Sequence, residues 1–584
     1  MRAVDRAFDY LVPDTSESAI AVGTIVRVPL HGRRVRGWVM GIDVEPEAEP
    51  GTLLPIQAVV SAGPPPDVVD LCAWAAWRWA GPRQSFLLAA SPPNLVTPGP
   101  ADLDVAVFPP FDAPMDLPDA RVRTLRWPPT APRGELVRAL TASEGSTIVV
   151  VPDPIEAESL VHSLRGDGRQ VLVLRGDQPA AERTRAWERA RHGACVVIGG
   201  RVAVLAPVPD LAAFVVLDDA DEALKDERSP AWHARDLAAE RARRLAARFD
   251  IVSPMPSVEA IAGAERAAAV DRAHERAGWP RLDVVDLRDQ APGEHLLSGS
   301  LTNALHTALA DRGRALCVLN RRGKARLLAC SACRELVRCS MCGGALAESG
   351  AALVCPRCGA SAPTVCAHCG SGSLRTLRTG VTGMREQISR LVPRAQVVAV
   401  DTASAPLPAF DVAVGTEAVL HRVRNDPARP VRLVAFLDFD QELLAPRYRA
   451  AEQALWLLVR AARIVGPRAD GGVVLVQTRL PDDPVVVAAR DASLDSVLEA
   501  EVERRRTFAF PPFAGLAELS GASGAVAAAC DALRSTVDVL GPTDDRALLR
   551  APSAAALCDA LAATDLSVAR AHGRLRIEVD PLRV

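Results

Sequence analysis

Lysine is nearly missing from this sequence of 584 residues: of its 68 lysines and arginines, only Lys225 and Lys324 are lysines. A loop that cradles the phosphates of a nucleotide needs exposed backbone N–H groups, usually from glycines, and a lysine followed by Ser or Thr. Lys225 follows a leucine, and Lys324 follows a glycine but precedes an alanine. Neither lysine therefore fits such a loop.

Two other stretches could take the place of this loop. Residues 124–140, where the loop before a first α/β helix belongs, read TLRWPPTAPRGELVRAL. Its prolines remove N–H donors, and it has no lysine. Residues 380–385 read GVTGMR, with Met384 and Arg385 at the end that should bind phosphate. A standard phosphate loop is therefore excluded, and a lysine-free route to triphosphate binding is left open.

Long apolar runs are also missing. No uninterrupted apolar stretch approaches eighteen residues, and the first ten residues, MRAVDRAFDY, lack the apolar core of a signal peptide. We expect a soluble, cytoplasmic, nucleoid-associated protein with no membrane partner. The net charge of −3 and the pI near 6.4 mean that any nucleic-acid surface has to be a local patch.

Cysteine, by contrast, is concentrated in one place. Residues 330–369 read CSAC-x5-CSMC-x12-CPRC-x7-CAHC, which is four Cys-x2-Cys pairs. Each pair points two sulfurs at one centre, so four pairs predict two closed four-thiolate Zn²⁺ sites that stabilise structure and do no chemistry. Glycines follow three of the pairs, where the turn needs a positive φ. The alternative, a disulfide framework, is disfavoured because the chain has no secretory segment.

The remaining cysteines are scattered, and we expect them to be buried small apolar residues. They are Cys72, Cys195, Cys317, Cys530 and Cys558.

The hydrophobic pattern divides the chain into several domains. In two regions, continuous apolar strands alternate with amphipathic helices, which predicts an α/β fold with two doubly wound parallel sheets. The predicted organisation is a β-rich domain at 1–95, a linker or eroded domain at 96–132, a first α/β lobe at 133–285, a second lobe at 286–327 and 376–490, a cysteine insertion at 328–375, and an α+β domain at 491–584.

Arginine interleaved with aromatic residues marks the N-terminal domain. Guanidinium groups bind phosphates and aromatic rings stack on bases, so this cluster predicts DNA binding. The alternative is a solvated basic hairpin over an ordinary aromatic core. The residues concerned are Phe8, Tyr10, Arg27, Arg33, Arg34, Arg36 and Trp38.

An acidic run follows the apolar strand of the first lobe, where residues 215–221 read VVLDDAD. Mg²⁺ and an activating carboxylate would lie here, so Asp218 and Asp219 are candidate remnants of a nucleotide site. The alternative is a solvated acidic loop that caps the following helix. Hydrolysis also needs an arginine finger from the second lobe, for which Arg460 and Arg463 are available.

Several segments, taken in this order, resemble the PriA family of primosomal N′ proteins, which restart stalled replication forks. The resemblance implies a superfamily-two DNA helicase scaffold: an N-terminal domain that grips the 3′ end of a nascent strand, a winged helix, two RecA-like lobes, a zinc insertion and a C-terminal domain. The segments are Arg6-Ala-Phe-Asp-Tyr, Gly199-Gly-Arg-Val-Ala-Val-Leu-Ala-Pro, Trp232-His-Ala-Arg-Asp, Asn320-Arg-Arg-Gly, Pro446-Arg-Tyr-Arg-Ala-Ala-Glu, Phe510-Pro-Pro-Phe and Val579-Asp-Pro-Leu.

The resemblance also implies roles for particular residues. Phe8, Asp9 and Tyr10 match the family's pocket for the 3′ terminus, although Gln57 stands where the family has lysine and the family's glycine near His31 is shifted to Gly32. In the family, the outer cysteine pairs share one zinc and the inner pairs share the other. This assigns Cys330, Cys333, Cys366 and Cys369 to the first zinc, and Cys339, Cys342, Cys355 and Cys358 to the second.

The departures from the family pattern are concentrated in the motor. The phosphate-binding loop is missing, and the family's Asp-Glu-Glu-His is Asp-Asp-Ala-Asp at 218–221. The family's Gly-Ser-Ala-Thr-Pro is Val-Ser-Pro-Met-Pro at 252–256, and Ile464 and Pro467 stand at the arginine-finger positions. Only residues 96–132 are available for a winged helix. These departures predict that the family's overall fold is kept and that its ATP-driven helicase activity is lost.

Three hypotheses follow. We favour a replication-restart protein without helicase activity that binds DNA forks, 3′ ends and single-stranded gaps. It would recruit single-stranded-DNA-binding protein and other primosome proteins through a two-zinc platform, while binding of ATP and Mg²⁺ is left open. The alternatives are an active ATP-dependent 3′–5′ helicase with a non-standard nucleotide site, and a zinc scaffold that binds protein partners only.

Overall fold

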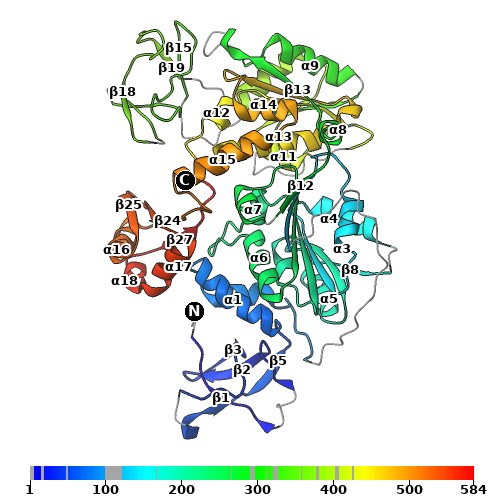
Figure 1. Cartoon of the computed structure of the whole chain (residues 1–584), viewed down its shortest axis with the longest axis vertical. Helices are drawn as coiled ribbons and strands as arrows, with labels where there is room; N and C mark the ends of the chain where they lie inside the picture. Colours follow the sequence, from blue (N-terminus) through cyan, green and yellow to red (C-terminus); the bar gives the residue numbers. More distant parts are fainter. Residues whose placement is uncertain are drawn as a thin grey trace. The chain divides into compact units, whose positions relative to one another are not determined.

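The chain forms two compact units in the computed structural model (Figure 1). Unit 1 comprises residues 1–126, 132–268 and 508–581, and unit 2 comprises residues 127–131, 269–507 and 582–584. The stretch 96–132, expected to be a linker or eroded winged helix, lies largely outside the described residues, as does Lys324. The structure describes residues 6–14, 19–47, 50–98, 121–165, 168–264, 266–289, 296–310, 312–319, 327–350, 352–356, 358–376, 381–400, 407–423 and 426–584.

The N-terminal part of unit 1 is a small β domain followed by two helices. Its antiparallel sheet has the order β3-β2-β5, and β1 pairs with β4 in a parallel two-stranded sheet. The β2–β3 hairpin turns at His31 and Gly32, whose φ values of 47° and 73° suit a two-residue turn of type I′. The elements are β1 (Tyr10–Leu11), β2 (Ile25–Leu30), β3 (Arg33–Trp38), β4 (Leu54–Pro55), β5 (Ala58–Ser61), α1 (Pro66–Arg78) and α2 (Arg83–Ala90).

The centre of unit 1 is a seven-stranded sheet of order β12-β6-β11-β10-β7-β9-β8, in which β6 to β11 pair in parallel. Its strand β6 begins at Val122, inside the stretch interpreted as a linker. The strands are β6 (Val122–Arg126), β7 (Ser146–Val150), β8 (Gln170–Val173), β9 (Cys195–Gly199), β10 (Leu211–Leu217), β11 (Arg248–Ser253) and β12 (Arg266–Ala269). The helices are α3 (Gly134–Thr141), α4 (Pro154–Leu164), α5 (Ala180–Ala190), α6 (Ala234–Leu245) and α7 (Val258–Gly263).

The C-terminal domain of unit 1 is an antiparallel sheet of order β25-β26-β24-β27 with three helices. One hydrophobic core joins this domain to α1 and to the seven-stranded sheet, through residues such as Trp79, Phe214 and Leu549. These parts of unit 1 are therefore packed as one body. The elements are β24 (Gly515–Gly521), α16 (Ser523–Leu533), β25 (Asp538–Thr543), β26 (Arg546–Ala551), α17 (Ala554–Ala563), α18 (Ser567–Ala571) and β27 (Leu575–Val579).

Unit 2 is built on a six-stranded parallel sheet of order β13-β23-β22-β14-β21-β20. The boundary expected at residue 285 falls inside its strand β13, which belongs to this sheet and not to the first. The strands are β13 (Arg281–Asp286), β14 (Arg314–Val318), β20 (Val397–Val400), β21 (Val412–Gly415), β22 (Val431–Phe436) and β23 (Val473–Thr478). The helices are α8 (Arg272–Ala277), α9 (Gly299–Ala310), α10 (Val381–Leu391), α11 (Ala418–Arg422), α12 (Asp440–Leu443), α13 (Ala450–Val465), α14 (Pro484–Asp491) and α15 (Asp495–Thr507).

The cysteine-rich insertion of unit 2 follows β14. In its described residues, all regular secondary structure consists of short antiparallel strands. Two small sheets, β15-β19 and β16-β17-β18, carry it. They are β15 (Leu328–Cys330), β16 (Ala347–Ser349), β17 (Ala352–Val354), β18 (Ser361–Pro363) and β19 (Leu374–Thr376).

The two parallel sheets with flanking helices confirm the predicted α/β class, with a β-rich N-terminal region and an α+β C-terminal region. The prediction succeeds because strands buried on both faces read as continuous apolar runs, such as FVVL in β10. Within the described parts of the chain, no helix has both the length and the apolar character that crossing a bilayer requires.

Candidate functional site

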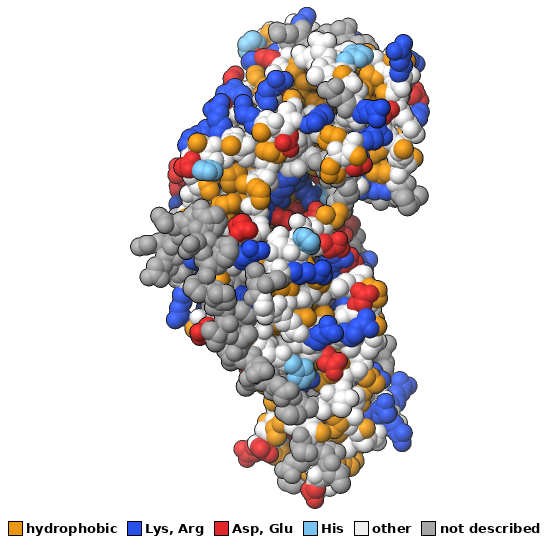
Figure 2. Space-filling model, turned by 90° about the vertical axis from the view of Figure 1, so that its right-hand side faces the viewer, with side chains coloured by type: hydrophobic (Ala, Val, Ile, Leu, Met, Phe, Trp, Pro, Cys, Tyr) orange, Lys and Arg blue, Asp and Glu red, His pale blue; other side chains and the backbone are white. Residues whose placement is uncertain are grey.

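The β2–β3 hairpin of the N-terminal domain has two chemically different faces. Val26, Val28 and Val35 lie on the inner face and belong to a small hydrophobic core. Because side chains alternate along a strand, Arg27, Arg34 and Arg36 lie on the opposite, outer face. Figure 2 shows basic side chains gathered at one edge of the lower end of the molecule, where Figure 1 places this domain.

The residues expected to form the 3′-terminus pocket lie elsewhere in the domain. The Tyr10 hydroxyl donates a 2.9 Å hydrogen bond to the Pro29 carbonyl, and its ring packs against the inner core. The Asp9 carboxylate accepts a 2.8 Å hydrogen bond from the backbone N–H of Glu47. Phe8 is 40% exposed, with the guanidinium of Arg6 5.7 Å from the ring centroid.

The residues predicted to bind DNA therefore lie on both sides of the β2–β3 sheet. Tyr10 lies on the inner side, whereas Arg27, Arg34 and Arg36 lie on the outer side. Arg33 shares the inner parity of Val35 and lies at the turn end of β3. Sequence proximity suggested one cluster, but strand alternation separates it into two.

The acidic end of β10 in unit 1 is buried and paired. Arg133, at the N-terminus of α3, donates 2.9 Å hydrogen bonds from two different nitrogens to the two carboxylate oxygens of Asp218. The same guanidinium donates a 2.9 Å hydrogen bond to Glu156. Asp218 is fully buried and adopts a φ of 54°. Both oxygens that a metal ion would need therefore already have a cationic partner.

Electrostatics favours a charged Arg133 in this arrangement. Desolvation lowers the pKa of Arg133, but the nearby carboxylates of Asp218 and Glu156 raise it by more. Burial raises the pKa of Asp218 to about 8, and the Arg133 charge acts in the opposite direction. Both oxygens of Asp218 accept hydrogen bonds from one guanidinium, so the Arg133 charge opposes protonation of this carboxylate.

Asp219, the second candidate at this strand end, is also fully buried. Its carboxylate accepts hydrogen bonds from the backbone N–H and the hydroxyl of Ser257. Arg235 lies 3.7 Å away and donates a 2.8 Å hydrogen bond to the same hydroxyl. The alternative interpretation of a solvated acidic loop is therefore wrong for both residues, because each is enclosed and partnered.

The two candidate arginine fingers both come from α13 of unit 2. Arg460 contacts the ring of His421. The Arg463 Nε donates a 3.2 Å hydrogen bond to the carbonyl of Pro129, and its guanidinium lies 5.4 Å from the ring centroid of Trp456. Each side chain thus has a partner within its own unit.

Arg133 is the partner of Asp218 that the sequence interpretation did not include. The available signal was its position, directly before α3 and after a proline-rich loop, where a phosphate-binding lysine would lie. A basic residue at this position predicts an ion pair with the acidic strand end, because the carboxyl ends of all parallel strands in one sheet lie at the same edge.

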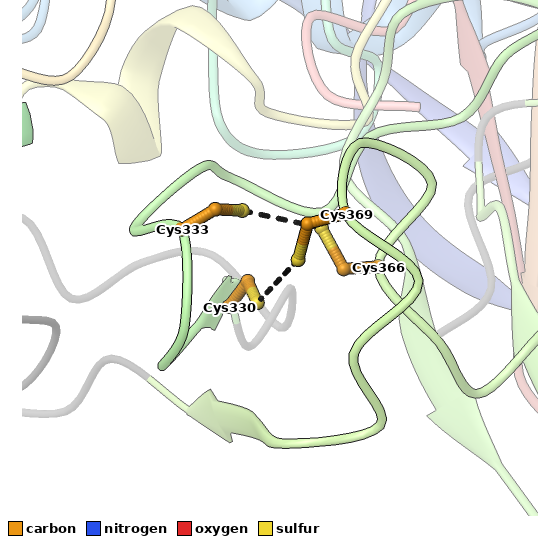
Figure 3. A group of neighbouring side chains, drawn as sticks. All are labelled: Cys330, Cys333, Cys366 and Cys369. Atoms are coloured by element: carbon orange, nitrogen blue, oxygen red, sulfur yellow. Dashed lines mark hydrogen bonds between the residues drawn. The ribbon is translucent and has the colours of Figure 1, made fainter.

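The eight cysteines of the insertion form two tetrads. Cys330, Cys333, Cys366 and Cys369 make one, and Cys339, Cys342, Cys355 and Cys358 make the other, with the sulfurs of each tetrad within 4.8 Å of one another. The grouping is the nested one that the family resemblance implies. Figure 3 shows the first four side chains, which point toward a common centre.

The geometry of both tetrads fits a tetrahedral metal ion. Sulfur–sulfur distances are 3.6 Å for Cys330–Cys369 and 3.5 Å for Cys333–Cys366. The matching distances in the second tetrad are 3.6 and 3.5 Å. Four sulfurs 2.3 Å from a tetrahedral zinc lie about 3.8 Å apart, so only a small expansion is needed. The two tetrads could therefore each hold a metal ion such as Zn²⁺.

All four Cys-x2-Cys turns have the same backbone. In each, the residue after the second cysteine donates its N–H to the carbonyl of the first and adopts a positive φ of 67–75°. Glycine stands there in three turns, as the sequence predicted, and Arg334 stands in the fourth. The five cysteines outside the tetrads are all buried, which confirms the prediction for them.

Backbone N–H groups of these turns stabilise thiolates. Burial raises the pKa of Cys330, but hydrogen bonds from the N–H groups of Cys333 and Ala332, together with those of the Cys369 and Cys333 thiols, outweigh it and lower the pKa to about 6. The N–H groups of Cys342 and Met341 lower the pKa of Cys339 to about 7. One thiol of each tetrad is therefore held near neutral pH in the form that binds metal.

The outer parts of the chain match two family models. Residues 1–92 match the model described as the 3′ DNA-binding domain of PriA, and residues 506–582 match the C-terminal domain of primosomal protein N. Among solved structures, Saccharomyces cerevisiae Dbp5 bound to RNA and ADP BeF3 shares 10% identity over 66% of this chain and 89% of that chain, with a TM-score of 0.35.

Curated relatives extend the match over nearly the whole chain. The probable replication restart protein PriA of Mycobacterium tuberculosis H37Rv is 31% identical over 93% of this chain and 89% of the relative. The corresponding Mycobacterium leprae protein is 30% identical over 100% of this chain and 99% of the relative. The replication restart protein PriA of Bacillus subtilis is 25% identical over 70% and 54%. The chain therefore belongs to the PriA family of replication restart proteins.

Proposed function

We propose that this protein acts in replication restart as a DNA-binding platform that does not unwind DNA with ATP. It binds forks, 3′ ends and single-stranded gaps through its N-terminal domain. It holds two structural zinc ions in the cysteine tetrads, and it recruits single-stranded-DNA-binding protein and other primosome proteins. Apart from the linker end at 132 and the lobe boundary at 285, which the strands β6 and β13 displace, the domain boundaries predicted above are part of this proposal.

The observation that carries the proposal is the pairing of Arg133 with Asp218. In ATP-driven motors built from two α/β lobes, the aspartate at the strand end holds Mg²⁺, and a lysine from the loop before the first helix holds the phosphates. Here an arginine at that loop takes both oxygens of the aspartate at 2.9 Å. Opening the site for Mg²⁺ would break a buried ion pair, which costs several kcal/mol. The proline-rich loop before Arg133 offers few N–H groups to compensate.

The zinc part of the proposal rests on the donor set. Eight thiols in two closed tetrads, with no position left for a substrate, are typical of structural zinc. When bound, zinc would contribute folding energy to an insertion that has little hydrophobic core of its own.

An ATPase assay tests the absence of a motor. We expect no phosphate release above background from wild-type protein with Mg²⁺ and ATP, with or without forked DNA. A nucleotide titration of the wild type should show no binding in the micromolar range. Phosphate release that an Asp218→Asn/Asp219→Asn variant abolishes would instead establish an active helicase with a non-standard nucleotide site.

A DNA-binding assay tests the platform. We expect forked DNA to bind at low salt and the affinity to fall steeply as salt is added, because phosphate contacts release counterions. If forked DNA does not bind at low salt, the zinc scaffold for protein partners alone becomes the better description.

A further inference from the structure

The outer face of the β2–β3 hairpin carries an unusual pair of like charges. Arg27 and Arg36 are direct partners across the antiparallel ladder, and Arg34 is opposite Pro29 on the same face. Side chains directly opposite each other have Cβ atoms about 5 Å apart, and like charges there destabilise a sheet. A soluble domain gains nothing in stability from this arrangement.

These charges are not neutralised by the described part of the chain. Among the described residues, no carboxylate forms an ion pair with Arg27, Arg34 or Arg36. Arginines elsewhere in unit 1 behave differently: Arg235 reaches Asp236, and Arg241 reaches Asp67 at 2.9 Å. Arg34 and Arg36 are exposed, and Arg27 is half-buried. The face therefore offers three guanidinium groups to an external anion.

The aromatic ring on this face is already engaged. Trp38 lies on the same face of the sheet as Arg34 and Arg36, but its indole N–H donates a 2.9 Å hydrogen bond to the Ser91 hydroxyl. The ring packs against the main core of unit 1. Binding of single strands relies on aromatic rings that stack on bases, and Trp38 is not free to do so. Phe8, the exposed ring of this domain, belongs to the segment that packs on the inner side.

We propose that Arg27, Arg34 and Arg36 form an arginine track for the phosphates of a DNA duplex arm, separate from the 3′-terminus pocket at Phe8–Tyr10. Residues two apart on a strand are about 6.8 Å apart, which equals two steps of the axial rise of about 3.4 Å per phosphate on one strand of a duplex. The inference rests on the proposed function, because it assigns the backbone contacts and the end recognition of one DNA-binding domain to two different surfaces.

Salt titrations of the full-length, zinc-loaded protein test the arginine track. The probe is a fluorescent forked duplex whose nascent strand ends in either a 3′-hydroxyl or a 3′-phosphate, and anisotropy is measured from 50 to 200 mM NaCl. For an Arg27→Gln/Arg34→Gln/Arg36→Gln variant, we expect the slope of log affinity against log salt to fall by about 0.9 per lost contact, or about 2.7 in all. The ratio of affinities for the two ends should not change.

The matched variants separate the two surfaces. Phe8→Ala should reduce the ratio for the two ends and leave the slope unchanged. A triple change of exposed arginines in lobe 1, Arg165→Gln/Arg185→Gln/Arg189→Gln, removes the same charge and should leave the slope as in wild type. An unchanged slope in the arginine-track variant, or a parallel loss of end preference, would overturn the inference. Wild-type protein that fails to bind the fork at 50 mM NaCl would refute the proposed function itself.

A charge reversal excludes a merely structural role. Arg36→Glu places opposite charges across the ladder with Arg27, so the melting temperature should stay equal or rise while DNA affinity falls at least tenfold. If these arginines only supported the fold, the melting temperature would fall together with the affinity.

Discussion

Arg133 and Asp218 are joined by two parallel hydrogen bonds of 2.9 Å, although 85 residues separate them in the sequence. The guanidinium comes from the start of α3 and the carboxylate from the end of β10, the two places that supply the phosphate loop and the metal ligand in a two-lobed motor. In the function proposed above, the Arg133 guanidinium takes the place of the magnesium–nucleotide complex of such a motor.

The first prediction concerns this ion pair. Arg133→Met leaves a fully buried carboxylate without a partner, so we expect unit 1 to lose about 3–5 kcal/mol of stability. The double variant Arg133→Met/Asp218→Leu removes both charges and should recover most of that loss. Urea denaturation followed by circular dichroism measures both. If the losses of Arg133→Met and of Asp218→Leu, measured alone, simply add in the double variant, the two groups are not coupled.

The second prediction concerns the pairing of the cysteines. Cys330→Ser and Cys366→Ser belong to one tetrad, so each single change, and also the double change, should lower bound zinc from two ions to one per chain. Cys330→Ser/Cys339→Ser breaks both tetrads and should leave none. Elemental analysis of the purified protein gives the count, and Cys530→Ala, a buried cysteine outside the tetrads, is the control. A different count for the Cys330/Cys366 double change would refute the nested pairing.

Local patterns predicted the fold class and the cysteine turns well. The period of apolar residues distinguishes strands from helices, and a Cys-x2-Cys spacing fixes a turn whose next residue needs a positive φ, as found at Gly343, Gly359 and Gly370. Both signals lie within a few residues of the structure that they specify, so no knowledge of the tertiary fold is needed.

Partners far apart in sequence could not be predicted in the same way. The acidic strand end could be interpreted as solvated because no residue near Asp219 indicates its partners, Arg235 in α6 and Ser257 at the start of α7. Likewise, sequence proximity grouped Arg33 with Arg34 and Arg36, whereas the two-residue period of β3 places it on the other face. Which side chains are buried, and on which face of a sheet they lie, depends on which strands become neighbours in the fold.

The third prediction concerns Lys225, the one lysine in the described part of the chain. It is buried, and its ammonium group donates hydrogen bonds to the carbonyls of Val579, at 3.0 Å, and of Asp580. It also lies 3.4 Å from Glu578. These contacts attach the loop after β10 to the last strand of the C-terminal domain.

Lys225→Met should therefore destabilise unit 1 by about 1–3 kcal/mol, because buried acceptors lose their donor. We also expect faster proteolytic release of the domain beginning near residue 508. The control is Arg228→Met, an exposed neighbour that removes the same charge. Equal unfolding midpoints for the two variants would show that the Lys225 contacts contribute nothing.

The fourth prediction concerns the pH dependence of unit 2. Asp440 is fully buried, and its carboxyl accepts a 2.9 Å hydrogen bond from the backbone N–H of Arg479 as well as one from the Thr478 hydroxyl. Burial and the nearby carboxyl of Asp438 raise the pKa of Asp440 to about 7. An unfolded aspartate has a pKa of about 3.9, so between about pH 4 and 7 the folded state holds a proton that the unfolded state has lost. The contribution of this group to stability is therefore largest at low pH and declines as the pH rises to 7.

Asp440→Asn removes this titration while keeping an oxygen that can accept the hydrogen bonds of Thr478 and Arg479. We expect the wild type, relative to Asp440→Asn, to lose stability steadily as the pH is raised from 5.5 to 7.5. Urea midpoints of the zinc-loaded proteins at several pH values give the comparison. Asp482→Asn, at an exposed position of the same unit, should run parallel to the wild type over this range. A constant difference between wild type and Asp440→Asn would show that Asp440 keeps an ordinary pKa in the folded protein.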